Sequence, residues 1–492
     1  MLEGISKNTV RLSLSKPTYW FSDYLKRLRQ AQSDSITRVF RDAINQKPIN
    51  YFLLLSSLIF YCLLAFWIER HQTNLLLPAF GFLFASYLWV LRTETTKEIL
   101  FWVYASILFR FCFLFAIPHL TDDFYRFIWD GRLLAKGYHP FAELPRYYIE
   151  NKILLVGIDQ ALFDKLNSPD YFTIYPPVNQ FIFWIAAKLS SRSILGSVVV
   201  MRVFILAAEV GSIWLIRKIL LHFQLPEKNI LLYAFNPLVI IELTGNLHFE
   251  ALMIFFLLLS FWLLITNKIF LSALQFGLAI CSKLIPIILL PLLLVRLGWK
   301  KSAIYYLVVV VSSILFFLPL LNAEIISGFS ESIGYYFKKF EFNASIYYLV
   351  REWGFWKYGY NIIQTVGVKL AIYCAAAILF YTVLDFILNV KRKHKVLPTA
   401  YSTLPTSYLI VLTIYFAFAT TVHPWYTTTL LALSVFTKFR FPAVWTGSIF
   451  LTYAGYTTNG FSENLWITGI EYVIVFGYLA YETIWKREKS AL

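Results

Sequence analysis

Long apolar runs restrict the fold of this chain more than any other feature. Eight runs reach or approach the ~20 mostly apolar residues that a helix needs to cross a bilayer. Backbone polar groups in lipid must be bonded internally, so such runs fold as helices. With the shorter apolar runs between them, they predict an all-α polytopic membrane protein with about 13–15 membrane-embedded segments. The eight runs are 51–68, 75–91, 99–117, 197–216, 303–321, 366–390, 405–421 and 465–484.

The composition agrees with a membrane protein. Of 492 residues, 59% are hydrophobic and 15% are charged, whereas soluble domains carry about 25% charged residues. The net charge of +16 comes from short basic clusters between apolar runs, which favours cytoplasmic loops over a nucleic-acid partner. The four cysteines lack metal or disulfide spacing, so we expect no metal site, and no cofactor is indicated.

The basic loops also predict the topology and the parts of the chain. Residues 1–49 form a cytoplasmic basic lead-in with a stretch suited to an interfacial helix. Residues 50–98 supply two additional spans, and 99–492 form the main membrane domain. Its loops 118–174 and 322–365 fall on the outer side. The topology of 175–245 stays open, because two full spans between 175 and 216 would place a basic loop outside.

A dense charge cluster, TDDFYRFIWDGR, follows the third apolar run. Helical spacing places Asp123, Arg126 and Asp130 along one face. The cluster is either an ordinary ion-paired helix end or a general base beside a phosphate site. Asp122 and Arg132 complete it.

Polar side chains also interrupt several other apolar runs. Ionisable groups at membrane depth are costly and are therefore functional candidates, although a lysine can snorkel and aromatic residues can form an interfacial belt. The H-x-E pair at 248–250 lacks the further ligands of a zinc site. Arg202 and Glu209 are expected to form a buried structural pair. The other residues at such interruptions are Tyr175, Glu242, Asn246, His248, Glu250, Lys283, His423, Trp425 and Tyr426, and the outer loop 322–365 adds Asn343 and Arg351.

The succession DDFYRFIWDGRLLAKGYHPF, YPPVNQ, NPLVIIELTGNLHFEALM, SKLIP and HPWY resembles the GT-C superfamily over roughly 99–430. Within it, the chain is most similar to bacterial polyprenol-phosphate-mannose-dependent mannosyltransferases, and distantly to the catalytic subunit of GPI mannosyltransferase I. One departure is H-x-E at 248–250, where H-x-D is more usual.

The resemblance implies an inverting glycosyl transfer at the outer face of the bacterial cytoplasmic membrane. A hexose would move from a polyprenyl-phosphate donor in the bilayer to a lipid or glycan acceptor. Mannose is the expected hexose. Asp123 would be the general base, with Asp122 as assistant or rival. The donor phosphate would bind Arg126, Arg132, Lys283 and Arg351. The substrates would also contact Asp130, Tyr175, Asn246, His248, Glu250, His423, Trp425 and Tyr426.

Three alternatives remain open. A transferase of the same fold could use arabinose, aminoarabinose or glucose, since the motifs do not separate these donors. A transporter or lipid flippase should show internal repeats, and none is visible. A structural subunit of an assembly would not need acids and cations gathered at one membrane face.

Overall fold

The structure is a computed structural model that describes residues 46–93, 98–153, 155–321, 328, 334, 338–392 and 401–489. The chain divides into two compact units, Met1–Phe52 and Leu53–Leu492. The predicted interfacial helix near the N-terminus lies outside the described residues. The predicted domain boundaries stay a prediction.

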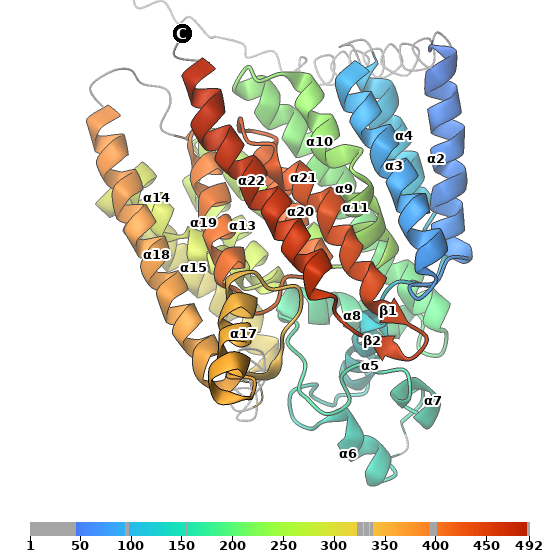
Figure 1. Ribbon diagram of the computed structural model, residues 1–492. Coiled ribbons are helices and arrows are strands. Elements are labelled where there is room, and N and C mark those ends of the chain that lie inside the picture. Colours follow the sequence, from blue (N-terminus) through green and yellow to red (C-terminus); the bar gives the residue numbers. More distant parts are fainter. Residues whose placement is uncertain are drawn as a thin grey trace, which may run out of the picture. The chain divides into compact units, whose positions relative to one another are not determined.

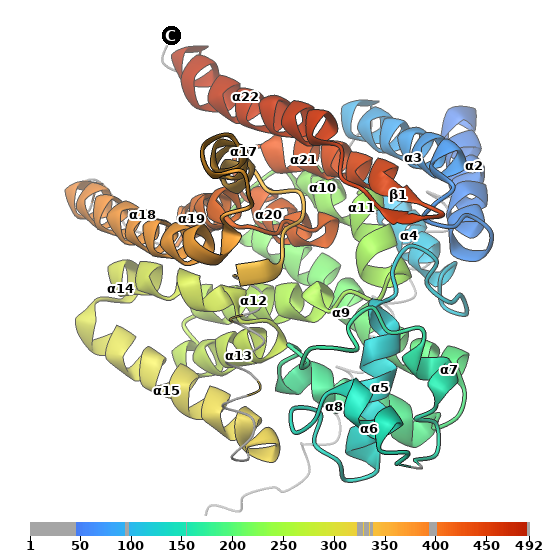
Figure 2. The same cartoon turned by 60° about the horizontal axis from the view of Figure 1, so that its bottom comes forward.

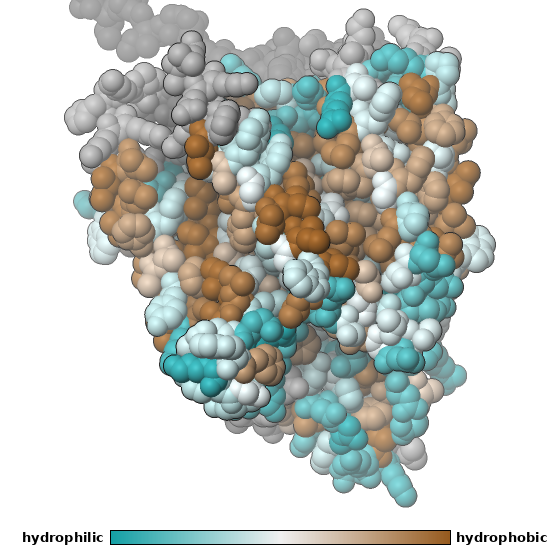
Figure 3. Space-filling view, in the orientation of Figure 1, coloured by the Kyte–Doolittle hydropathy of each residue, from teal (hydrophilic) through white to brown (hydrophobic). Residues whose placement is uncertain are grey.

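Six described helices are long and apolar enough to cross a membrane, which confirms the all-α polytopic class. Apolar side chains are frequent along the flanks of the long helices, and polar ones gather toward their ends, with many at the lower end of the view (Figure 3). These helices are α2 (Pro48–Phe66), α3 (Thr73–Thr93), α9 (Ile194–His222), α15 (Trp299–Phe317), α18 (Ile363–Arg392) and α22 (Leu465–Lys489) (Figure 1).

Two of the eight predicted spans are shorter than the sequence indicated. The runs 99–117 and 405–421 form α4 (Ile99–Phe111) and α19 (Leu404–Phe418), of 13 and 15 residues. At 1.5 Å per residue, each is shorter than the ~30 Å hydrocarbon core. α8 (Pro177–Leu189) also has only 13 residues. It is therefore too short for a full span, so 175–216 does not hold the two full spans that would place the basic loop outside.

Short helices and one hairpin make up the rest of the described chain. The α-helices are α5 (Asp123–Ala135), α6 (Pro145–Glu150), α7 (Gln160–Phe163), α10 (Ile230–Ala234), α11 (Pro237–Val239), α12 (Glu250–Ile265), α13 (Ile269–Ser282), α14 (Pro291–Leu297), α17 (Ile346–Tyr358), α20 (Thr427–Ser434) and α21 (Phe441–Ser448). The 3-10 helices are η1 (Glu227–Asn229), η3 (Ile285–Leu289), η4 (Leu318–Leu320), η5 (Pro424–Tyr426) and η6 (Ile449–Gly455), and η2 (Ile240–Gly245) is a π-helix. The strands β1 (Tyr456–Thr457) and β2 (Gly460–Phe461) pair antiparallel.

Arg202 on α9 holds two of the helix breaks together. Its guanidinium donates to the carbonyl oxygens of Leu114 and Ala116, just after α4, at 3.2 and 2.5 Å. It also donates to the carbonyls of Thr244 and Gly245 at the end of η2, both at 2.9 Å. These carbonyls have turned out of regular helices, and one fully buried arginine satisfies all four. The predicted Arg202–Glu209 pair is therefore wrong.

Glu209 instead pairs with Arg110 on α4. The Nη2 atom of Arg110 lies 2.9 Å from a Glu209 carboxylate oxygen, and both side chains are fully buried. Tyr233 donates to the other carboxylate oxygen at 2.6 Å. Sequence spacing within α9 favoured a pair on one helix, whereas the structure links α9 to α4 and α10.

A sharp break separates η2 from α12. Asn236 caps α11 by accepting from the backbone N–H groups of Leu238 and Val239. The π-helix η2 follows, and Leu247 adopts a φ of 62°, which is uncommon for a residue other than glycine. The two helical parts meet at 112°. Irregular backbone of this kind is often found at functional sites.

Several loop segments meet at one end of the Leu53–Leu492 unit. Figures 1 and 2 place α5, α6, α7 and the β1–β2 hairpin at the end opposite to the C-terminal end of α22. α5 packs against α8, and α12 packs against α9 and α13. Residues that are far apart in the sequence are thus brought to one end of the helices.

Replacing Arg202 by leucine should destabilise the protein strongly. It would leave four buried carbonyls without their donor, and a single unsatisfied polar group costs about 1–3 kcal/mol. We expect a loss of at least about 3 kcal/mol, measured by unfolding in detergent. Arg217→Leu is the matched control on the same helix, because Arg217 is exposed and pairs with Glu227. An equal effect of the two substitutions would contradict the account.

Candidate active site

A cavity of about 260 Å³ opens among the helix breaks, close to the lower end of the ~300–1,000 Å³ range of small-molecule sites. Its walls come from α5, the loop before α8, the start of α12, the end of α13 and η5. Nine of the predicted site residues line it: Asp123, Arg126, Tyr175, His248, Glu250, Lys283, His423, Trp425 and Tyr426.

The two adjacent aspartates at the start of α5 have different surroundings. Asp123 lines the cavity, and its carboxylate accepts a hydrogen bond from the Nδ2 atom of Asn167 at 2.6 Å. Asp122 is not among the lining residues, and its carboxylate pairs with Arg70 from the loop between α2 and α3. The start of a helix favours negative charge, which suits both positions. The geometry nevertheless directs only the second carboxylate to the cavity.

Arg126 lines the cavity with a guanidinium that is held by protein groups. Its Nε atom donates to Asp130 at 2.8 Å, and its Nη1 atom donates to the carbonyls of Ser168 and Tyr171 at 2.8 and 2.9 Å. Gln180 donates to the second oxygen of Asp130 at 3.0 Å. Asp130 thus holds Arg126 in place. The pair fixes the loop that carries Asn167.

One wall of the cavity is a stack of rings. The rings of His248 and Trp425 lie 3.6 Å apart at 16°, and those of Trp425 and His423 lie 4.4 Å apart at 7°. Pro424 begins η5, and the residues on either side of it, His423 and Trp425, line the cavity. Such flat apolar faces are suited to contact with a sugar ring or an isoprenoid chain.

Lys283 supplies an ammonium group at the break after α13. It pairs with Glu250 at the start of α12 and lies 4.4 Å from the ring centre of Tyr426. The lysine side chain is 26% exposed, whereas that of Glu250 is 3% exposed. Both residues line the cavity, and the lysine side chain is the more exposed of the two.

His423 is held in its neutral form. Removal of its ring from water and the positive charges of Lys283 and His248 lower the pKa of His423 well below its ordinary value of 6.5. The wall of the cavity thus contains a neutral imidazole.

The second predicted outer loop reaches the cavity from another side. The backbone of Phe342 pairs with that of Thr420 and Val422, at 3.1 and 2.8 Å. Its ring lies 4.6 Å from that of His423, and the neighbouring Phe340 lines the cavity. This segment therefore fixes the position of the His-Pro-Trp-Tyr turn.

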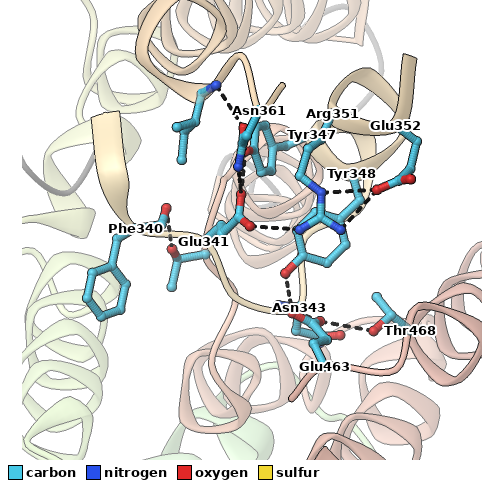
Figure 4. Close-up of polar contacts among 12 residues, drawn as sticks. Phe340, Glu341, Asn343, Tyr347, Tyr348, Arg351, Glu352, Asn361, Glu463 and Thr468 are labelled. Carbon is cyan, nitrogen blue, oxygen red and sulfur yellow. Dashed lines mark hydrogen bonds and ion pairs between the residues drawn. The ribbon is translucent and has the colours of Figure 1, made fainter. Parts of the chain in front are cut away.

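A polar network holds this segment (Figure 4). Arg351 on α17 donates to Glu341 at 2.7 Å and to Glu352 at 3.0 Å. Although burial alone would raise it, the pKa of Glu341 lies below its ordinary value because Tyr347 and Arg351 donate to its carboxylate. Tyr348 donates to Glu463, which follows the β1–β2 hairpin. The network joins the loop to the C-terminal part of the chain.

Five predicted site residues do not line the cavity. Asp122 pairs with Arg70, and Asp130 with Arg126. Arg132 donates to the carbonyl of Gly157 at 2.6 Å, Asn246 donates to Glu242 at 2.9 Å, and Arg351 pairs with Glu341. Any substrate role of these five stays a prediction.

Sequence reasoning missed two polar partners of the aspartates. Asn167 lies in the long loop before α8, where KLNSPDY offers one amide among other polar residues. Arg70 lies between two apolar runs, where a basic residue is ordinary. Neither position carries a local signal, because each becomes significant only when the fold brings it to α5.

The fold and the cavity together define a multi-pass helical membrane protein with a charged, aromatic-lined site at its helix breaks. Residues 56–298, slightly under half of the chain, match a family model described as alpha-(1->6)-mannopyranosyltransferase, N-terminal domain. The predicted resemblance to mannosyltransferases is confirmed. The match begins inside α2, earlier than the expected residue 99, and resemblance beyond 298 stays a prediction.

Alpha-(1->6)-mannopyranosyltransferase B of Corynebacterium glutamicum is 28% identical to this chain over 149 residues. The match covers 29% of the chain and 23% of that protein, so the chain spans less than a quarter of the relative's length. No solved structure matches the chain. The family and the Corynebacterium glutamicum protein are both described as glycosyltransferases, which agrees with the predicted class of enzyme.

The protein should lose stability as the pH falls from 7 to 5. The unfolded chain binds a proton on His423 near pH 6.5 and the folded chain does not, so acid favours unfolding by up to about 1.4 kcal/mol per pH unit. His423→Gln should flatten the pH dependence of the unfolding free energy. His71→Gln, at a partly exposed histidine beside Glu69, is the control for the loss of a histidine side chain. An identical pH dependence in all three proteins would be inconsistent with a neutral His423.

Proposed function

We propose that this protein is a membrane mannosyltransferase that moves mannose from polyprenyl phosphate to a lipid or glycan acceptor outside the cytoplasmic membrane. One observation carries the proposal: Asp123 and Lys283, a base and a cation, line one cavity with a ring stack between apolar helices. The similarity to mannosyltransferases supports the sugar. The basic loops support the outer side.

Asp123 is the proposed general base. The acceptor hydroxyl would lie within hydrogen-bond reach of its carboxylate, with Asn167 fixing the other side of that group. The acceptor oxygen attacks the anomeric carbon as the bond from that carbon to the phosphate oxygen breaks. The proton passes to Asp123, and polyprenyl phosphate leaves with the bonding electron pair. The configuration inverts, so a β-linked donor would give an α-linked product, and the α-(1→6) linkage is the first to test.

Lys283 is the proposed partner of the leaving phosphate. Negative charge grows on the phosphate as the glycosidic bond breaks, and a preorganised cation stabilises that charge. Glu250 orients the ammonium, and the neutral His423 can donate a hydrogen bond to phosphate or sugar without an added charge. Tyr175, Trp425 and Tyr426 would contact the sugar ring or the first isoprenoid units.

Asp123→Asn should abolish most of the transferase activity while leaving the fold intact. An amide cannot take the acceptor proton, and loss of a general base lowers rates by ~10²–10⁴-fold. The assay is transfer from polyprenyl-phosphate-mannose by purified protein in detergent. Asp122→Asn is the matched control, because its carboxylate does not line the cavity. Near-full activity of Asp123→Asn would exclude this residue as the base, and an inactive wild type would exclude the donor class.

Lys283→Met should lower the rate of the chemical step more than it weakens donor binding. The lost stabilisation is greatest when the phosphate carries its full charge, and removal of one such group costs ~10²–10³-fold in rate. Single-turnover kinetics with saturating donor give this rate. Lys188→Met serves as the control, since Lys188 is exposed and donates to a backbone carbonyl away from the cavity. Equal rates for the two variants would rule out the proposed role.

A further inference from the structure

Arg70 joins three segments that are far apart in the sequence. It lies in the loop between α2 and α3, and its guanidinium pairs with Asp122 at the start of α5. The guanidinium also lies 5.1 Å from the ring centre of Tyr456 in β1. Its backbone N–H donates to the carbonyl of His119 at 3.4 Å. The loop between α2 and α3 thus contacts the start of α5, the helix that carries Asp123.

The pair matters because Asp122 immediately precedes Asp123. Like charges on adjacent residues repel each other. Arg70 balances the first carboxylate, and both partners are 35% exposed, so salt screens the pair less than a fully exposed one. With Asp122 balanced, the negative charge of Asp123 is the one that faces the cavity.

The ring of Tyr456 adds a reason for an arginine at this position. A planar guanidinium can lie over an aromatic ring and still pair with a carboxylate. Tyr456 in turn packs against Phe461 and Tyr453, with ring centres 4.8 and 5.7 Å away. Arg70 is therefore held both by Asp122 and by the hairpin that follows η6.

We propose that Arg70 is a positioning residue of the transfer reaction: it pairs with Asp122, so that Asp123 alone takes the acceptor proton. This inference rests on the proposed function of the cavity. It gives the helix pair α2–α3 a part in catalysis that its apolar sequence does not reveal. The expected consequence is a specific coupling between Arg70 and Asp122 in the rate of transfer.

The test measures transfer by Arg70 variants in the assay with polyprenyl-phosphate-mannose. Arg70→Met should lower kcat at least about tenfold and change the KM for the donor less than about threefold, because only the chemical step depends on Asp123. Arg70→Lys keeps the charge but loses the planar guanidinium over Tyr456, so its kcat should lie between those of Arg70→Met and the wild type. Arg146→Met is the control, because Arg146 forms an exposed pair with Asp170.

The double variant Arg70→Met/Asp122→Asn separates the role of charge from a purely structural one. With no carboxylate left to balance, its kcat should return to within about threefold of wild type. If the double variant stays as slow as Arg70→Met, or if Arg70→Met is fully active, the inference is overturned while the proposed function stands. An inactive wild type would overturn both. Melting temperatures show whether a slow variant is folded.

Discussion

The buried guanidinium of Arg202 is the interaction on which the site depends. Four backbone carbonyls from two broken helices converge on it. Irregular backbone is tolerated in a membrane protein only where other protein groups or water satisfy it. Without this donor set, the turn after α4 and the end of η2 would carry unpaired carbonyls. Asp123 follows the turn after α4 in the chain, and His248 follows the end of η2. Arg202 therefore stabilises the segments that lead to both site residues.

The charges of the site are arranged in pairs, with one exception. Arg126 is paired with Asp130, Lys283 with Glu250 and Arg70 with Asp122. Each pairing limits the cost of bringing ionised groups out of water. Asp123 instead accepts a hydrogen bond from a neutral amide. A carboxylate that is oriented in this way, facing a cavity, has the character expected of a general base.

Much of this organisation could be predicted from the sequence. Charge at 121–132, and proline together with charge at 234–253 and 281–286, interrupt apolar runs, and the structure breaks its helices at or beside these segments. Such interruptions are local properties of the sequence and can be recognised without the fold. Nine of the residues predicted in this way line one cavity. Partners across the fold could not be predicted. The spacing of Arg202 and Glu209 would allow a pair on α9, but Arg202 bonds backbone carbonyls and Glu209 pairs with Arg110. Periodicity within one helix cannot reveal partners on other elements.

The central claim is that the cavity binds a lipid-linked sugar between Asp123 and Lys283. A structure of the protein in lipid nanodiscs with a non-transferable polyprenyl-phosphate-mannose analogue tests it most directly. The account predicts the phosphate at the ammonium of Lys283, the sugar against the ring stack of His248, Trp425 and His423, and the anomeric carbon facing the carboxylate of Asp123. An analogue bound elsewhere, with this cavity empty, would contradict it.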